Sequence, residues 1–194
     1  MFRRREKPPL LMRIRNWFWP RRGWKRAIAF YWHRLKRIPG TPESIAAGFA
    51  CGLACAFSPL LGTHTILAAL LAWGMGGSVI AALVGTLCLN PWTAPPVWYA
   101  SYELGALILP GSDGHKAGIA EFVAMFGALT RSALSLNGEL FMQAVWPVFR
   151  PMLVGSIPLG IVAGFVAYFA LAPVLRRVQE NRALKRGRRA EGHD

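Results

Sequence analysis

Residues 44–102 read SIAAGFACGLACAFSPLLGTHTILAALLAWGMGGSVIAALVGTLCLNPWTAPPVWYASY, a run of 59 residues without Asp, Glu, Lys or Arg. A second charge-free run of 25 residues covers positions 151–175. Because about 20 apolar residues cross the hydrocarbon core of a bilayer, the first run is long enough for two or three crossings and the second for one. A buried helix of a soluble protein rarely reaches this length and usually keeps a polar face. The two runs therefore predict an all-α integral membrane protein.

The charges lie at the two ends of the chain. Residues 1–37 contain 13 Lys and Arg and one acid, whereas residues 38–175 contain three bases and five acids. Residues 176–194 contain seven bases and three acids. Only 16% of the 194 residues are charged and 54% are hydrophobic, a composition that excludes an ordinary cytosolic enzyme. We divide the chain into a basic segment (1–38), a membrane domain (39–175) and a basic cytoplasmic tail (176–194).

The membrane domain contains three apolar blocks and a more polar connector. The blocks cover 44–73, 79–109 and 140–175, and the connector covers 110–139. Lys and Arg resist translocation, so both termini are predicted to face the cytoplasm, which requires an even number of crossings. We expect four, with a hairpin over 140–175; two crossings are the alternative if the blocks form re-entrant hairpins. Thr41, Pro42 and Glu43 predict the start of the first apolar helix.

An amphipathic helix is predicted over residues 23–38. Its aromatic and aliphatic side chains fall broadly on one face and its bases largely occupy the rest, as expected for an interfacial helix on anionic lipids. The candidate membrane-surface residues are Trp24, Lys25, Arg26, Trp32, Lys36 and Arg37. Nucleic acid is the alternative partner for basic tails. The adjoining apolar chain favours the membrane surface, and no nucleic acid is expected.

Two prolines interrupt the apolar blocks near their middles, after Ser58 and after Asn90. Proline cannot donate an amide hydrogen bond, and non-helical backbone at membrane depth is costly unless protein or a water-filled cavity satisfies it. Broken membrane helices with hydroxyl and amide side chains at the break often form a binding site. A proline kink or a re-entrant packing element is the alternative. The candidate site residues are Ser58, Pro59, Gly62, Thr63, His64, Thr65, Asn90, Pro91, Thr93, Pro95, Pro96 and Glu103.

Two of these residues carry specific expectations. Glu103 is the only acid inside the main apolar block, which suggests a proton or cation relay; an interfacial position is the favoured alternative, because Pro110 follows seven residues later. The side-chain amide of Asn90 both donates and accepts hydrogen bonds. Asn90→Leu is therefore predicted to abolish function, and Asn90→Ser to retain part of it. The prolines leave the carbonyls of Cys55 and Leu87 in need of a new donor.

The sequence contains no recognisable catalytic constellation. It has no phosphate loop, no paired thiol ligands and no nucleophile elbow, and no acid is placed to orient His64 as a base for Ser58. Cys51, Cys55 and Cys88 lie in apolar runs without zinc-like spacing, so they are interpreted as reduced packing residues. We expect no enzyme, no metal and no cofactor.

Several of these motifs together resemble a known bacterial family. The residues that carry the resemblance are Thr41-Pro42-Glu43, Gly48, Gly52, Pro59-Leu60-Leu61-Gly62-Thr63-His64-Thr65, Gly85-Thr86 and Asn90-Pro91-Trp92-Thr93-Ala94-Pro95-Pro96. The chain is similar over about residues 20–175 to the membrane-protein family catalogued as domain of unknown function 2062. Family members often carry Asn where this chain has Ser78. The resemblance implies a bacterial inner-membrane protein and supplies no biochemical activity.

Two functions are compatible with these features. The first is a transporter or lipid-handling protein whose broken helices form a site near the membrane midplane. The second is a non-catalytic structural or accessory protein that binds other membrane proteins through small-residue helices, at Gly48 and Gly52, and through its tails. A chain of 194 residues is short for an alternating-access transporter, so a homo-oligomer is a further expectation.

Overall fold

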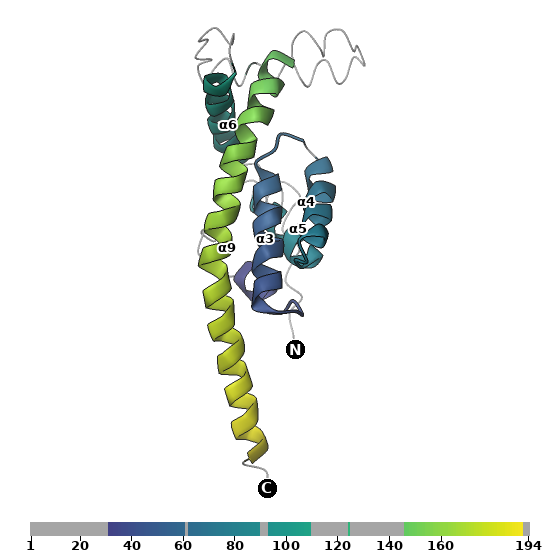
Figure 1. The fold of residues 1–194 in the computed structure, drawn as a ribbon, viewed down its shortest axis with the longest axis vertical. Coiled ribbons are helices and arrows are strands. Elements are labelled where there is room, and N and C mark those ends of the chain that lie inside the picture. The colour runs from purple at the N-terminus through teal and green to yellow at the C-terminus, as the bar shows by residue number, and fades with distance from the viewer. Residues whose placement is uncertain (1–30, 61, 90–92, 110–123, 125–145, 192–194) are drawn as a thin grey trace, which may run out of the picture. The chain divides into compact units, whose positions relative to one another are not determined.

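The computed structural model describes residues 31–60, 62–89, 93–109, 124 and 146–191. The chain divides into two compact units, Met1–Arg37 and Ile38–Asp194. Every regular element within the described residues is a helix, which confirms the all-α prediction. Residues 31–35 of the first unit are helical, and the helices labelled in Figure 1 belong to the second unit.

Helix α3 (Pro42–Ala56) starts where the residue types predict it. The Thr41 Oγ1 caps the helix by accepting a hydrogen bond from the Ser44 amide at 3.2 Å. Pro42 occupies the first turn, where no donor is needed, and Glu43 places a negative charge at the positive end of the helix dipole. The helix ends at Ala56.

Helix α4 (Thr63–Gly74) runs antiparallel to α3 (Figure 1). The start of α3 therefore lies beside the chain that follows α4. The Ser44 Oγ donates to the Gly76 carbonyl at 3.1 Å, and the Ser78 amide donates to the Ser44 carbonyl at 2.8 Å. Helix α5 (Val79–Thr86) begins at this point, capped by the Ser78 hydroxyl, and returns along α3. Helices α3 and α4 thus form an antiparallel hairpin, and the short helix α5 packs on it.

Two glycines of α3 allow α5 to pack at close range. A Cβ on Gly48 would lie 2.1 Å from the Ser78 carbonyl oxygen, and one on Gly52 would lie 2.0 Å from that of Ala82. No side chain fits at these distances, so any larger residue would force the helices apart. The small residues of α3 thus permit close helix packing, as predicted, and they do so within the chain.

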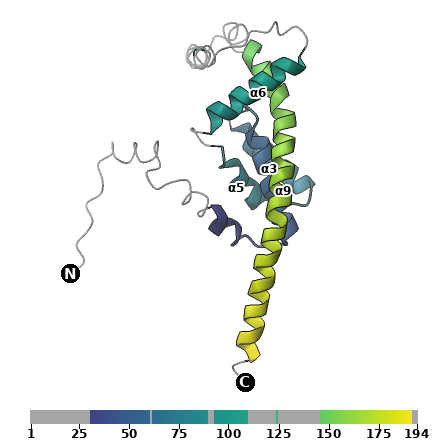
Figure 2. The same ribbon diagram turned by 90° about the vertical axis from the view of Figure 1, so that its left-hand side faces the viewer.

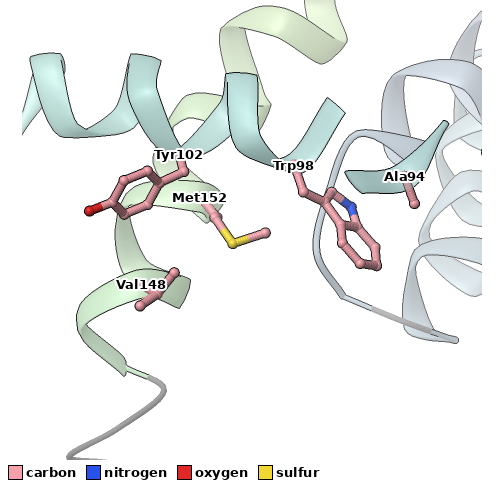
Figure 3. Close-up of a cluster of buried hydrophobic side chains, with 5 residues drawn as sticks. All are labelled: Ala94, Trp98, Tyr102, Val148 and Met152. Atoms are coloured by element: carbon pink, nitrogen blue, oxygen red, sulfur yellow. The ribbon is translucent and has the colours of Figure 1, made fainter. Parts of the chain in front are cut away.

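Helices α6 (Ala94–Ile108) and α9 (Trp146–Glu191) form the second contact region. They run antiparallel, because Gly105 lies against Pro151 and Ser101 against Gly155. A cluster of buried side chains fills this interface, with Met152 of α9 between the rings of two α6 residues (Figure 3). The cluster comprises Ala94, Trp98, Tyr102, Val148 and Met152.

Helix α9 is continuous, so the predicted hairpin over 140–175 is wrong for its described residues. Pro151, Pro158 and Pro173 all lie inside this helix. Each proline removes one amide donor and favours a kink. Packing against α6 and then against α3 supports the helix along much of its apolar length (Figure 2). The basic residues from Arg176 onward continue the same helix up to Glu191.

Large apolar side chains lie exposed along α4, α5 and α9. They include Ile66, Leu70, Trp73, Ile80, Leu83, Ile157, Ile161, Phe165 and Phe169. Among the described helices, α9 alone is long and apolar enough to cross a membrane, over Trp146–Leu184, whereas α3 and α4 are apolar but shorter. Soluble monomers rarely expose contiguous apolar surfaces of this extent.

Candidate functional site

The first predicted break begins at Ser58, and its described residues gather around the carbonyl oxygen of Leu60. This oxygen accepts from the His64 amide at 3.0 Å, and the His64 Nδ1 and Thr63 Oγ1 lie 2.9 and 3.4 Å from it. A carbonyl partner assigns the ring proton to Nδ1. It leaves Nε2, 3.5 Å from the Thr65 Oγ1, as an acceptor. The structure thus brings three predicted site residues together, and their polar groups stabilise the turn itself.

Three further predicted residues shape the same turn. The Ser58 amide donates to the Cys55 carbonyl at 3.1 Å, so a backbone donor replaces the one that Pro59 lacks. The Ser58 Oγ accepts from the Leu60 amide at 3.4 Å. Gly62 has a φ of 89°, which side chains rarely tolerate, and leads directly into α4. The turn therefore reverses the chain instead of kinking one helix.

The second predicted break covers residues 87–93 and is described at its two ends. Two predicted site residues, Asn90 and Pro91, lie outside the described residues, so their roles stay predictions. The Thr93 Oγ1 donates to the Cys88 carbonyl at 3.0 Å and thereby bridges the interruption. Pro95 and Pro96 lie in the first turn of α6, where a missing amide costs no helical hydrogen bond.

Contacts with α9 place the other helices along its length. A Cβ on Gly164 would lie 3.2 Å from the Ala50 carbonyl oxygen, and one on Gly160 would lie 2.6 Å from that of Ala54. A Cβ on Gly155 would lie 1.9 Å from a backbone oxygen of α6. Helix α3 therefore packs beside the middle of α9, and α6 lies nearer its start (Figure 2).

The two breaks begin at nearly the same level beside α3. Gly85, one residue before the end of α5, would place a Cβ 2.4 Å from the Phe49 oxygen and 2.9 Å from the Leu53 nitrogen. Leu53 lies three residues before the end of α3 at Ala56. Since each helical residue rises about 1.5 Å, the breaks start within roughly one helical turn of each other in height. The first then sends the chain back along α3, whereas the second sends it onward into α6.

Glu103 lies apart from both breaks. It is two residues from Gly105, whose Cβ would lie 1.8 Å from the Pro151 oxygen, and Pro151 directly follows Arg150. The carboxylate accepts a hydrogen bond from the Tyr99 hydroxyl one turn earlier. Its level near the charged start of α9 favours the interfacial interpretation over a relay at the membrane centre.

Sequence reasoning did not single out the ion pair between Glu43 and Arg176. The Arg176 Nε donates to the Glu43 Oε1, and the Gln179 Nε2 donates to the Gly40 carbonyl at 3.1 Å. The pKa of Glu43 is lowered, first by a hydrogen bond from its own backbone amide and then by the one from Arg176. A signal was present, because Glu43 directly precedes one charge-free run and Arg176 directly follows the other.

The predicted membrane-surface residues are described only in part. Trp24, Lys25 and Arg26 lie outside the described residues. The Lys36 Nζ lies 4.5 Å from the centre of the Trp32 ring, which is a cation–π contact within the first unit. The role of these residues at a membrane surface stays a prediction.

The cysteines predicted to pack are free thiols. Cys51 and Cys55 are buried in a cluster with Ala68, Ala72 and Ala82, and Cys88 is half-buried. No group of three or more His, Cys, Asp or Glu that could hold a metal ion occurs in the part of the chain that the structure describes.

Comparison with known proteins yields one family. A family model described as "Uncharacterized protein conserved in bacteria (DUF2062)" matches residues 25–183. No curated protein and no solved structure matches the chain.

Proposed function

The chain belongs to the bacterial DUF2062 family, and we propose that it is a small inner-membrane protein that handles lipid or transports a solute at the two helix breaks. The observation that carries this proposal is the α3–α4 hairpin. It is too short to cross a bilayer, it exposes large apolar side chains, and its turn contains several polar groups.

The length of α9 supports its assignment as a membrane-spanning helix. The 25 uncharged residues between Arg150 and Arg176 extend about 37 Å, which exceeds the roughly 30 Å of the hydrocarbon core. Exposed side chains along this stretch include Ile157, Phe165 and Phe169. In water this surface would be an aggregation liability, whereas lipid tails cover it without cost.

With α9 as reference, the α3–α4 hairpin is re-entrant. Gly160 of α9 lies beside Ala54 of α3, so the end of α3, two residues later, lies beside Pro158. At a rise of about 1.5 Å per residue, the end of α3 is about 12 Å short of the level of Arg150. The turn therefore lies within the hydrocarbon region, and α4 brings the chain back to the side on which α3 began. Helices α5 and α6 together extend to the Arg150 end, where α9 starts.

This arrangement has two crossings, α5 with α6 and then α9, plus one re-entrant hairpin. It corresponds to the alternative with two crossings and replaces the expected four, because α3 and α4 run antiparallel and α9 is one continuous helix. The start of α3 and the basic end of α9 then share one side. The seven bases of residues 176–194 assign that side to the cytoplasm.

A turn inside the hydrocarbon region requires a polar environment. Gly62 and Thr63 are exposed, and His64 and Thr65 are half-buried. Irregular backbone exposed to lipid is not tolerated at this depth, whereas irregular backbone that lines a water-filled cavity is. We therefore place the ligand site at this turn, at the level where the second break also begins.

In the accessory-protein alternative, partners bind through the small residues of α3 and through the basic tails, and the first of these surfaces is not free. Gly48 and Gly52 lie against α5 of the same chain and leave no room for a partner helix. Binding of other membrane proteins through the basic tails is still a prediction.

Labelling of introduced cysteines tests whether water reaches the turn between α3 and α4. In a chain whose three native cysteines are replaced by Ala, we introduce Thr63→Cys at the turn and Leu70→Cys as control. Leu70 is 59% exposed on the same helix, two turns away. A charged thiol reagent applied to membranes should label Thr63→Cys and spare Leu70→Cys. If neither reacts, the turn is dry and the site is rejected; if both react, the hairpin lies outside the bilayer.

Native mass spectrometry of gently extracted protein tests the ligand. The wild-type chain should carry a bound lipid or solute, and Thr63→Leu should lose it while the copy number stays the same. Equal retention by both proteins would show that the turn does not hold the ligand.

A further inference from the structure

Two sulfur-containing side chains meet between α3 and the end of α4, and a third lies one turn farther along α3. The Cys51 Sγ donates to the Met75 Sδ at a distance of 3.6 Å. Cys55 follows one turn later on the same helix and belongs to the same buried cluster as Cys51. Side chains four residues apart on a helix have Cβ atoms about 5–6 Å apart. Cys51 is therefore the common neighbour of Cys55, on its own helix, and of Met75, at the end of α4.

Backbone contacts hold Met75 in this position. Its amide donates to the Leu71 carbonyl at 3.0 Å and closes the last turn of α4. Gly76, with a φ of 69°, then ends the helix, and the Gly77 amide donates to the Ala72 carbonyl at 2.7 Å. These contacts form a typical helix C-terminal cap, so the thioether is supplied from a defined backbone position.

The surroundings of the thiols offer few other ligands. The cluster is completed by Ala68, Ala72 and Ala82, none of which has exposed surface. Methyl groups leave room for sulfur and supply no oxygen or nitrogen ligand. Cys51 and Cys55 are 6% and 8% exposed, whereas Met75 is 67% exposed and provides a route of entry from the surface.

We propose that Cys51, Cys55 and Met75 form a binding site for a soft monovalent metal ion, Cu(I). Thiolate and thioether ligands select Cu(I), whereas structural zinc sites are almost always completed by four ligands. Two sulfur atoms that each lie about 2.3 Å from one metal ion are roughly 3.8 Å apart, close to the separation of Cys51 and Met75.

Binding requires no redox step. Each thiol releases one proton to solvent as its sulfur–metal bond forms, and the thioether binds through a lone pair. The copper enters and stays as Cu(I), so no electron is transferred. The inference does not depend on the proposed function, because it uses none of the hydroxyl or imidazole side chains of the turn.

Metal titration of the purified full-length protein in detergent tests the site, with Cu(I) and redox-inert Ag(I) as probes. Native mass spectrometry gives the stoichiometry, and competition with a Cu(I)-specific chelator gives the affinity. One ion per chain is expected. Because loss of a supporting second-shell group alone weakens metal sites 10–100-fold, Cys51→Ser and Cys55→Ser should each weaken binding by roughly 100-fold, and Met75→Leu by roughly tenfold.

Cys88→Ser is the matched control, because Cys88 is the third thiol of the chain and lies outside the cluster. It should bind as the wild type does. Equal weakening in Cys88→Ser, wild-type affinity in Cys51→Ser, Zn(II) bound as tightly as Cu(I), or no ion in the wild type would each overturn the proposal. Circular dichroism of each variant separates ligand loss from unfolding, and Thr63→Leu should keep the ion even if it loses the ligand of the turn.

Discussion

The two interruptions of the long apolar run are alike in sequence and opposite in outcome. Each contains a proline and nearby hydroxyl side chains, and each begins at nearly the same level beside α3. After residues 57–62 the chain reverses into α4, whereas after residues 87–93 it continues into α6. The first is closed by local bonds around Leu60. The second leads to a helix positioned by α9, far away in sequence. At each break a proline follows the end of a helix, and the residues and contacts after it set the direction.

The largest effect is expected from separating α6 from α9. Gly105→Leu would place a side chain where a Cβ already lies 1.8 Å from the Pro151 oxygen. Overpacking of this kind should lower the free energy of unfolding by about 3 kcal/mol. The measurement is denaturant unfolding in detergent, followed by circular dichroism. Leu107→Ala on the exposed face of α6 is the control and should change stability by less than about 0.5 kcal/mol. Similar losses in both variants would remove the argument that α9 positions α6.

The next effect concerns the reversal at the first break. Gly62→Ala forces a side chain onto a residue with a φ of 89°, which should cost about 1–3 kcal/mol although nothing lies within 4 Å of the new Cβ. Gly74→Ala, also in open space but at an ordinary φ, should leave stability unchanged or slightly higher. Thermal unfolding of the two variants measures the difference. Equal stability would mean that the reversal does not depend on this conformation.

A smaller effect should separate the hydroxyl groups of the two breaks. Thr93→Val removes the hydrogen bond to the Cys88 carbonyl and should cost about 1 kcal/mol. Thr63→Val should cost less, roughly 0.5 kcal/mol, because the Leu60 oxygen keeps its contacts with the His64 amide and Nδ1. Unfolding midpoints of both variants under the same conditions provide the comparison. A larger loss of stability in Thr63→Val would show that the other contacts of the Leu60 oxygen do not compensate for the missing hydroxyl.

The smallest effect is a pH dependence at the start of the hairpin. The pKa of Glu43 is lowered from its ordinary value of 4.5 by its own amide and by Arg176, so ionisation stabilises the folded state. This contribution is fully present above the ordinary pKa and is lost as the pH falls through the lowered value. The melting temperature should therefore decrease slightly on acidification below about 4.5, and Glu43→Gln should show a shallower decrease. Parallel pH profiles would contradict the assignment.

Much of the local structure could be predicted from residue types. Thr41, Pro42 and Glu43 predicted the start of α3, and Pro59 and Pro91 predicted the two interruptions of the apolar run. The charge-free run of residues 151–175 predicted the long apolar helix, and the motifs from Thr41 to Pro96 identified the family. Thr63 and His64, two of the candidate site residues, contact one carbonyl that the sequence did not single out, and their role in a ligand site stays a prediction.

The sequence by itself determined the helical class, the apolar character and the helix ends, because caps, prolines and missing charges act over a few residues. Only the tertiary structure decided that α6 packs against α9, that Gly48 and Gly52 pack against α5, and that Met75 lies beside Cys51. These features depend on contacts between residues 24 or more positions apart, and no local pattern specifies them. The same reason explains the missed Glu43–Arg176 pair, whose partners are 133 positions apart and meet only because α3 and α9 run antiparallel.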